Sequence, residues 1–155
     1  MVIFEEQIFL LAEDSENDVF LMQRALTAAG IPNPLQVVKD GEEVVAYLSG
    51  QGRYHNRSEY PLPAVVLLDL NLPRKNGFEV IEWMRTQPTL KRIVVIILTA
   101  SNRSADADRA YDLGANFYLT KPSKFDDLVK MTKCLHEWLK LNHFPSLTQA
   151  KETSP

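Results

Sequence analysis

Side chains that can bind metal or phosphate follow four of the five apolar runs in this sequence. In chain order they are Glu13 and Asp14, then Asp69, then Thr99, then Lys121. If the runs are parallel strands, their carboxyl ends meet at one edge of an open sheet, which is where such sheets bind ligands. We therefore expect three carboxylates, one hydroxyl and one ammonium to gather at a single site.

This set of groups suits phosphoryl chemistry. Three carboxylates that lie close together repel one another unless a cation intervenes, and such oxygen ligands suit Mg²⁺, with Mn²⁺ as a substitute. A dianionic phosphoryl group bound here would meet the metal on one side and Lys121 on the other. Asp69 is a candidate nucleophile that forms an aspartyl phosphate. Thr99 could donate a hydrogen bond to a phosphoryl oxygen, and the small Ala100 leaves room beside it.

Apolar runs that alternate with helical patterns predict an α/β protein with a parallel sheet. Two of the runs are apolar almost throughout, as expected of central strands that helices cover on both faces. Five strand–helix units in this order predict a (βα)5 fold. The expected strands are 7–13, 35–40, 64–70, 92–100 and 116–122, and the expected helices are 17–29, 41–49, 77–86, 104–113 and 124–141.

Local sequence signals predict several helix ends. Gly30 and Gly114 follow the first and fourth helical patterns, where glycine commonly stops a helix. Asp40 stands before the second pattern with Glu43 three residues later, which is the spacing of a capping box. Ser123 precedes the last helix, and Gly77 is assigned to the end of the turn after the third strand.

The composition indicates one globular domain with a sizeable core. The chain has 155 residues, of which 45% are hydrophobic and 24% are charged. A net charge of -3 argues against a nucleic-acid partner, which usually requires a basic surface. Cys134 is the only cysteine, so no internal disulfide can form and a cytoplasmic location is expected. No apolar run reaches the about 18 residues of a membrane span, and the first residues lack the basic region of a signal peptide.

Four short motifs contain the residues of the expected site. They are LLAEDS (10–15), LLDLNLPRKNG (67–77), VIILTA (95–100) and FYLTKP (117–122). Together they resemble the receiver domain of two-component response regulators, the CheY-like family. The resemblance extends over nearly the whole chain, so we expect a receiver domain at 1–141 and a tail at 142–155. It implies a flavodoxin-like fold, with a five-stranded parallel sheet in the order 2-1-3-4-5 and helices on both faces.

The resemblance also implies roles for the acidic residues. Asp69 would accept a phosphoryl group from a histidine kinase or a histidine phosphotransfer protein. Asp14, Asp69 and the main-chain carbonyl of Asn71 would bind Mg²⁺, with Glu13 acting largely through water. Such a domain is not an enzyme for an external substrate, because it catalyses its own phosphorylation and its own slow dephosphorylation.

A switch that responds to the phosphoryl group is a further implication of the resemblance. Thr99 and Tyr118 would form the switch pair, with Thr99 moving toward the phosphoryl group and Tyr118 filling the space that it leaves. Lys121 and Ala100 would contact the phosphate, and the peptide bond before Pro122 would be cis. The output would be a protein contact or onward phosphotransfer, to a target that the sequence does not name.

Two features depart from the minimal chemotaxis-type receiver. The acidic pair is Glu13–Asp14 rather than two aspartates, which the family commonly tolerates. The loop at 50–63 is longer, and with the segment LPRKNGFEVIEWMR it resembles stand-alone receivers that serve phytochrome-type photoreceptor kinases. We therefore expect a phytochrome-like sensor kinase as the upstream partner.

Other interpretations remain open from the sequence. Asp69 alone could cap the turn that follows it, and the acidic pair after the first strand could cap a helix. The alternative functions are a receiver-like module that works without phosphate, a flavin mononucleotide carrier and an aspartyl-phosphate hydrolase. The complete set of site residues argues against the first, and the acidic segment AEDSEND argues against the second. Asn71 argues against the third, because a hydrolase usually needs a carboxylate at that position.

The last helical pattern carries more apolar residues than one buried stripe requires. A second stripe holds Met131, Cys134, Trp138 and Leu141. A wide apolar surface indicates that something else covers it. We therefore expect a homodimer through the last helix and the fifth strand, with Met131 and Trp138 in its interface. The alternative is that the tail folds back and closes this face with Phe144 and Leu147.

Overall fold

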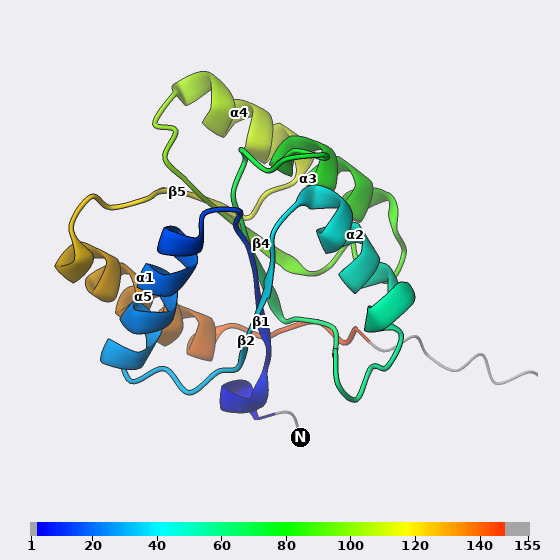
Figure 1. Cartoon of the computed structure of the whole chain (residues 1–155), viewed down its shortest axis with the longest axis horizontal. Coiled ribbons are helices and arrows are strands. Elements are labelled where there is room, and N and C mark those ends of the chain that lie inside the picture. Colours follow the sequence, from blue (N-terminus) through cyan, green and yellow to red (C-terminus); the bar gives the residue numbers. More distant parts are fainter. Residues whose placement is uncertain (1–2, 148–155) are drawn as a thin grey trace, which may run out of the picture.

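Five parallel strands form one sheet in the order that the family resemblance implies (Figure 1). The computed structural model describes residues 3–147. The strands are β1 (Phe9–Ala12), β2 (Leu35–Val38), β3 (Val65–Leu68), β4 (Val94–Thr99) and β5 (Phe117–Thr120). Their order in space is β2-β1-β3-β4-β5. Each strand is shorter than its predicted range, because only part of each range pairs with a neighbouring strand.

Helices cover both faces of this sheet. They are α1 (Glu16–Ala28), α2 (Gly41–Ser49), α3 (Gly77–Thr86), α4 (Ser104–Leu113) and α5 (Phe125–Leu141), with two short 3-10 helices, η1 (Phe4–Glu6) and η2 (Gly52–Tyr54). α1 and α5 pack together on one face, while α2, α3 and α4 cover the other (Figure 1). This arrangement confirms the predicted (βα)5 fold. No helix in residues 3–147 is long and apolar enough to cross a membrane.

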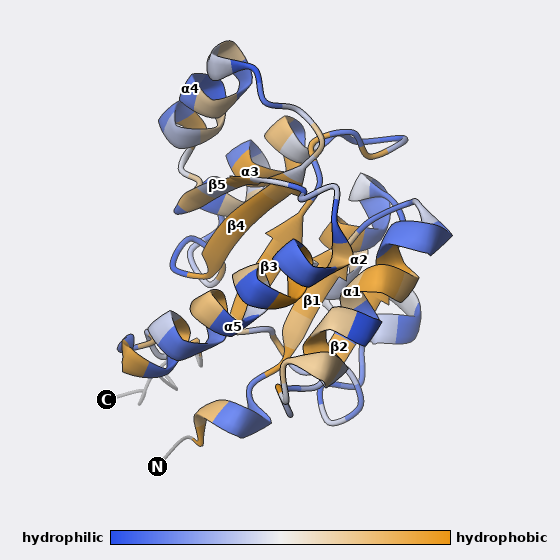
Figure 2. Ribbon diagram, turned by 90° about the vertical axis from the view of Figure 1, so that its left-hand side faces the viewer, coloured by the Kyte–Doolittle hydropathy of each residue, from blue (hydrophilic) through white to orange (hydrophobic). Residues whose placement is uncertain are grey.

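The central strands form the middle of the apolar core. All residues of β1 and β3 are buried, and so are all residues of β4 except its first. Figure 2 shows these three strands as the most continuous hydrophobic part of the molecule, whereas the helices are mixed in character. Apolar burial stabilises a fold by about 25 cal/mol per Å². The core therefore holds the carboxyl ends of β1, β3 and β4 in fixed positions relative to one another.

Most helix ends agree with the local sequence signals. The bounds of α2, α3 and α4 are those predicted, and the bounds of α1 and α5 differ by one residue. Gly114 caps α4 in the left-handed conformation, with φ 108°. The predicted cap of α5 is wrong by one residue, because Lys124 rather than Ser123 is its N-cap and has an extended backbone (φ -106°, ψ 137°).

The capping box predicted at the start of α2 forms only in part. The Asp40 carboxylate accepts a hydrogen bond from the N–H of Glu43 at 2.7 Å, as expected. The Glu43 carboxylate accepts from the N–H of Lys39 at 2.9 Å instead of from Asp40. It also contacts the Arg53 guanidinium at 2.6 Å and accepts from the hydroxyl of Tyr54. Contacts with the loop that follows α2 therefore compete with the local cap.

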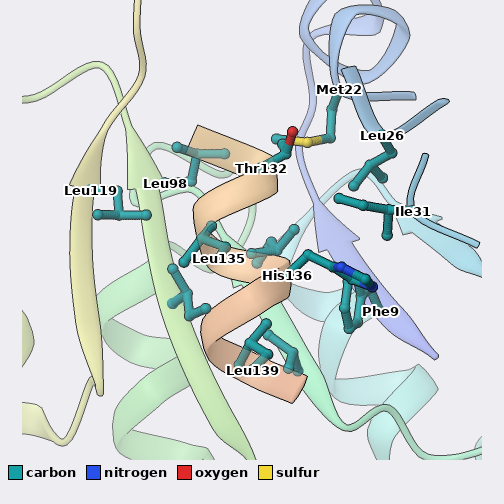
Figure 3. Close-up of a pocket in the computed structure, with 13 residues that line it drawn as sticks. Phe9, Met22, Leu26, Ile31, Leu98, Leu119, Thr132, Leu135, His136 and Leu139 are labelled. Atoms are coloured by element: carbon teal, nitrogen blue, oxygen red, sulfur yellow. The ribbon is translucent and has the colours of Figure 1, made fainter. Parts of the chain in front are cut away.

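The face that α1 and α5 cover contains one small apolar cavity (Figure 3). Its volume is about 20 Å³, which is room for about one water molecule. Met22 of α1 and Leu135 and Leu139 of α5 lie around it, together with side chains of the sheet. This face is therefore packed core and offers no space for an organic ligand.

The chain after α5 folds back onto the domain. Phe144 stacks on a phenylalanine of η1 with ring centroids 5.9 Å apart, and Leu147 packs against the core on the opposite face. Trp138 and Leu141 nevertheless remain 46% and 85% exposed. The tail thus folds back only in part as the alternative to a dimer requires, because Phe144 packs at the face of α5 and Leu147 packs on the opposite face. Trp138 and Leu141 of the second stripe stay open to solvent. Residues 148–155 of the expected tail lie outside the described residues.

Candidate functional site

Asp69 lies at the carboxyl edge of the sheet, directly after β3. Its N–H donates to the carbonyl oxygen of Ala12 at 3.1 Å, and its side chain is 7% exposed. Its carboxylate oxygen Oδ1 accepts hydrogen bonds from the hydroxyl of Thr99 at 3.0 Å and from the N–H of Asn71 at 3.1 Å. The other oxygen, Oδ2, accepts from Nζ of Lys121 at 2.9 Å. The ends of β3, β4 and β5 therefore meet at this carboxylate, as the sequence predicts.

The ammonium of Lys121 contacts three carboxylates. Its Nζ lies 2.6 Å from Oε2 of Glu13, 2.8 Å from Oδ2 of Asp18 and 2.9 Å from Oδ2 of Asp69. An ammonium has three hydrogens, so each carboxylate accepts one of them. The Lys121 side chain is only 19% exposed. These are therefore charge-assisted hydrogen bonds that water screens weakly.

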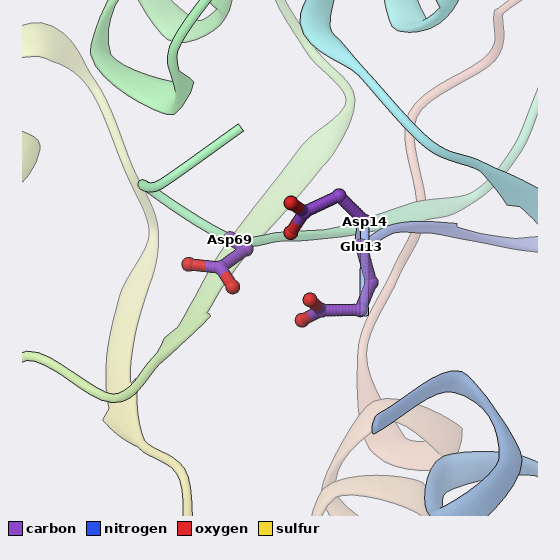
Figure 4. A group of neighbouring side chains, drawn as sticks. All are labelled: Glu13, Asp14 and Asp69. Atoms are coloured by element: carbon purple, nitrogen blue, oxygen red, sulfur yellow. The ribbon is translucent and has the colours of Figure 1, made fainter. Parts of the chain in front are cut away.

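Glu13, Asp14 and Asp69 form an acidic cluster (Figure 4). Carboxylate oxygens from all three residues lie within 4.8 Å of one another. Glu13 and Asp69 are buried, whereas Asp14 is exposed. A few hard oxygen donors with one side open to water fit Mg²⁺, which keeps part of its hydration shell in proteins. Asn71, the remaining predicted ligand, lies beside the cluster in the turn after β3, where its N–H contacts Asp69.

The carboxyl group of Glu13 is strongly affected by its surroundings. Burial raises its pKa to about 7, and the charge of Asp69 acts in the same direction. Hydrogen bonds from Lys121 and from the N–H of Ser15 lower the pKa but do not offset burial. Glu13 therefore changes its charge near neutral pH, and a cation in the acidic cluster would favour the charged form.

The pKa values of Asp69 and Lys121 shift in the directions that keep both groups charged. Burial would raise the pKa of the Asp69 carboxyl, but hydrogen bonds from Lys121 and Asn71 outweigh it, and the pKa falls below its usual value. Burial would lower the pKa of Lys121, but its hydrogen bonds to three carboxylates outweigh it and raise the pKa. At neutral pH, Asp69 is therefore an anion that can act as a nucleophile, and Lys121 is a cation.

The turn from β3 into α3 packs tightly against Asp69. The N–H of Gly77 donates to the carbonyl oxygen of Leu70 at 3.0 Å, and a Cβ on Gly77 would lie 2.6 Å from the carbonyl oxygen of Asp69. A complete capping box between Asn76 and Glu79 begins α3 at this point. Gly77 thus has the structural role that the sequence predicts, because the close approach leaves no room for a side chain.

The two residues of the predicted switch occupy different surroundings. Thr99 is fully buried and its hydroxyl contacts the acidic cluster. The hydroxyl of Tyr118 donates to the carbonyl oxygen of Ser101 at 3.0 Å, and its N–H donates to the hydroxyl of Tyr111 at 3.2 Å. Ala100 follows Thr99 and is exposed. Tyr118 is therefore held at the loop after β4, to which Thr99 leads.

The peptide bond before Pro122 is trans, so the cis bond implied by the family resemblance is wrong for this structure. None of the peptide bonds in residues 3–147 is cis. The trans isomer is favoured for a bond before proline by about 0.5–1 kcal/mol. Lys121 reaches all three carboxylates with this trans bond.

Asp18 belongs to the site although the motifs do not point to it. It lies in the first turn of α1, where its N–H donates to the hydroxyl oxygen of Ser15 at 3.2 Å. Its carboxylate contacts Lys121, 103 residues away in the sequence. Asp14 precedes the N-cap Ser15 and lies outside α1, so no helical spacing links it to Asp18. The sequence signal for Asp18 is limited to its place in the first turn of the helix that follows the acidic pair.

The family model of the response regulator receiver domain matches residues 9–133. This chain therefore belongs to the response regulator receiver domain family. Among known proteins, response regulator Rcp1 from Synechocystis sp. is 40% identical over 141 residues, which cover 90% of this chain and 94% of Rcp1.

Two solved structures have the same fold. The phosphorylated cyanobacterial phytochrome response regulator RcpA has a TM-score of 0.83 and 39% identity, with 91% of this chain and 99% of RcpA covered. The Mn²⁺-bound form of Rcp1 has a TM-score of 0.80 and 40% identity, with 90% of this chain and 99% of Rcp1 covered. The similarity confirms the CheY-like fold over nearly the whole chain.

Proposed function

We propose that this protein is a single-domain response regulator that accepts a phosphoryl group on Asp69. The donor is a histidine kinase or a histidine phosphotransfer protein, as is general for the family. One observation carries the proposal: the buried anion of Asp69 accepts hydrogen bonds from Thr99 and Lys121 beside an acidic cluster. Residues 1–141 form the receiver domain, and residues 142–155 form its tail.

The transfer step needs an aligned nucleophile and neutralised charge. A carboxylate oxygen of Asp69 attacks the phosphorus of phosphohistidine. A P–O bond forms as the P–N bond breaks, and the departing imidazole nitrogen keeps the electron pair and takes up a proton. Lys121 and the hydroxyl of Thr99 face the phosphoryl oxygens, and Ala100 leaves space beside them. Attack by water on the same phosphorus then slowly breaks the P–O bond to Asp69, which releases inorganic phosphate and restores the carboxylate.

The acidic cluster fits Mg²⁺ as a cofactor, with Mn²⁺ as a substitute. Asp14, Asp69 and the main-chain carbonyl of Asn71 would hold the ion, and Glu13 would act through water. The bound ion supplies charge neutralisation to the carboxylates and the phosphoryl oxygens. The Mn²⁺-bound form of the relative Rcp1 supports this proposal.

The response to phosphorylation begins at Thr99. Its hydroxyl follows the phosphoryl group, and Tyr118 leaves the carbonyl oxygen of Ser101 and enters the released space. The face formed by α4, β5 and α5 then has a changed affinity for a downstream protein. The net charge of -3 favours a protein target over nucleic acid.

The upstream partner in this proposal is a phytochrome-like sensor kinase, and this protein is cytoplasmic. Support comes from the similarity to RcpA, a cyanobacterial phytochrome response regulator. The loop at 50–63, which carries part of the resemblance to such receivers, is attached to α2, because the Arg57 guanidinium donates to the carbonyl oxygens of Tyr47 and Leu48. It also donates to the carbonyl oxygen of Tyr60 within the loop. Radiolabelled phytochrome-type kinase should transfer its phosphoryl group to this protein faster than a chemotaxis-type kinase does. Equal rates from both kinases would contradict this assignment.

Intact-mass spectrometry tests the phosphorylation itself. We expect phosphoramidate with Mg²⁺ to add one phosphoryl group to the wild type and none to Asp69→Asn. Asp112→Asn is the matched control, because Asp112 is an exposed aspartate of α4 outside the site, and it should react like the wild type. EDTA should suppress the reaction. A wild type that gains no mass with any small phosphodonor would overturn the proposal.

A homodimer through α5 and β5 is the remaining part of the proposal. Trp138 is 46% exposed and packs edge-on against Phe117 of β5, with ring centroids 4.7 Å apart. Met131 packs against the core at the same face and is half-buried. Sedimentation should give the dimer mass for wild type and for Lys133→Glu, and the monomer mass for Trp138→Glu. Equal masses for wild type and Trp138→Glu would contradict the dimer.

A further inference from the structure

Three carboxylates share the ammonium of Lys121, but they are not equivalent. Glu13 and Asp69 belong to the acidic cluster, in which carboxylate oxygens lie within 4.8 Å of one another. Asp18 lies outside that cluster and contacts Lys121 at 2.8 Å from the first turn of α1. Its side chain is 36% exposed, against 4% for Glu13 and 7% for Asp69. Asp18 is therefore the only one of the three that neither the metal nor the phosphoryl group would engage.

The hydrogen bonds of Lys121 must change when the site is used. All three ammonium hydrogens already have carboxylate partners. A contact with a phosphoryl oxygen therefore displaces at least one of them. Phosphorylation converts the carboxylate of Asp69 into an acyl phosphate, and Glu13 would contact the hydrated cation when one is bound. Asp18 undergoes neither change, and its backbone is fixed because its N–H donates to Ser15 at 3.2 Å.

We propose that Asp18 is a positioning residue of the phosphorylation site. It holds Lys121 at the carboxyl edge of the sheet while Glu13 and Asp69 exchange their partners. The inference rests on the proposed function, since it concerns the same reaction. Asp18 touches neither the metal ligands nor the reacting atoms, and it acts only through the lysine.

Two substitutions at Asp18 separate its charge from its size. Asp18→Asn keeps an oxygen acceptor but removes the charge, while Asp18→Glu keeps the charge on a side chain one methylene longer. We measure the initial rate of phosphorylation by phosphoramidate over a range of phosphoramidate and Mg²⁺ concentrations. Asp18→Asn should lower the maximal rate about fivefold, which converts to about 1 kcal/mol. The Mg²⁺ concentration that gives the half-maximal rate should change less than the maximal rate does. Asp18→Glu should recover most of the rate that Asp18→Asn loses.

Glu16→Gln provides the matched control. Glu16 lies in the same first turn of α1, and the substitution changes the net charge by the same amount. Its carboxylate contacts Lys39 at 3.5 Å and not Lys121. The rate of Glu16→Gln should equal that of the wild type. A loss as large as that of Asp18→Asn would show that general charge, and not the contact with Lys121, causes the effect, and it would overturn the proposal.

A double-mutant cycle tests whether Asp18 acts through Lys121. Lys121→Ala should slow phosphorylation more than Asp18→Asn does, and adding Asp18→Asn to Lys121→Ala should cause no further loss. A full additional loss in the double variant would overturn the inference, as would an unchanged rate for Asp18→Asn in an active protein. A wild type that accepts no phosphoryl group would instead overturn the proposed function, and the role of Asp18 with it. Thermal midpoints of all variants show whether each remains folded.

Discussion

Two basic residues, Lys121 and Arg85, are both half-buried and lie at opposite ends of the parallel strands, yet they have different kinds of partner. Lys121 donates to three carboxylates after the strand ends. Arg85 of α3 donates to neutral oxygens near the starts of β4 and β5. These are the carbonyl oxygens of Gly114 (2.6 and 2.9 Å), Lys91 (2.8 Å) and Ile93 (2.9 Å) and the side-chain oxygen of Asn116 (3.1 Å).

The difference in partners separates a structural cluster from a reactive one. Burial lowers the pKa of Arg85, and its neutral acceptors satisfy the guanidinium in a single arrangement. Around Lys121, negative charge exceeds positive charge, so another cation or a phosphoryl group can change the arrangement. A basic side chain whose hydrogen bonds are all satisfied can therefore be either structural or functional. The charge of its acceptors distinguishes the two cases.

Removing Arg85 should have the largest effect on stability and little effect on chemistry. Arg85→Ala leaves several carbonyl oxygens without a donor, and we expect a loss of about 3 kcal/mol in the free energy of unfolding. Urea denaturation measures this loss, and intact-mass spectrometry should still find phosphorylation of the folded protein. The lysine of Arg85→Lys reaches fewer of these oxygens, so the free energy of unfolding of this variant should lie between those of wild type and Arg85→Ala. A loss as small as that of an exposed ion pair would contradict the structural role.

The metal-free acidic cluster should make stability fall as the pH rises. The folded pKa of Glu13 is raised from 4.5 to about 7, so the folded protein holds a proton that the unfolded chain releases. The free energy of unfolding therefore decreases as the pH rises from 4.5 to about 7. We expect a decrease of about 2 kcal/mol for a buried group. The lowered pKa of Asp69 acts with the opposite sign, but only below its usual value of 3.8.

Glu13→Gln tests this pH dependence. Urea midpoints in EDTA between pH 4.5 and 7.5 should fall with pH for the wild type and change less for the variant. Saturating Mg²⁺ should flatten the wild-type curve, because the cation favours the charged carboxylate. Parallel curves for wild type and variant in EDTA would show that Glu13 does not cause the dependence.

Two glycines provide a matched comparison of the two regions. A Cβ on Gly77 would lie 2.6 Å from the carbonyl oxygen of Asp69, and a Cβ on Gly114 would lie 2.9 Å from the Arg85 side chain. Alanine at either position should destabilise the fold by about 1.5 kcal/mol. Only Gly77→Ala should also slow phosphorylation by phosphoramidate, because it displaces the backbone of Asp69. Equal rates for the two variants would contradict the link between the turn and the site.

The smallest effect is expected at the rim of the site. Lys39 and Glu16 lie 3.5 Å apart, with side chains 63% and 87% exposed. Lys39→Ala should change the free energy of unfolding by less than about 0.5 kcal/mol, because water screens such pairs. The phosphorylation rate should not change. A loss comparable to that of the glycine variants would show that this rim supports the site.

Local patterns predicted the helices well where neighbouring residues decide the structure. The bounds of α2 are those predicted, and Asp40 caps it as expected. The capping box failed at Glu43, because Arg53 and Tyr54 compete for its carboxylate. A tertiary contact can thus override a cap worth about 1 kcal/mol.

The sequence by itself determined the strand–helix order and the acidic, hydroxyl and ammonium groups that gather at the site. It could do so because the apolar runs end at Asp69, Thr99 and Lys121 in chain order, and parallel strands bring their ends together. Only the tertiary structure decided that Asp18 shares Lys121 and that Arg85 bridges the far edge of the sheet. Such contacts depend on how helices pack against strands distant in the chain. No local spacing encodes that packing.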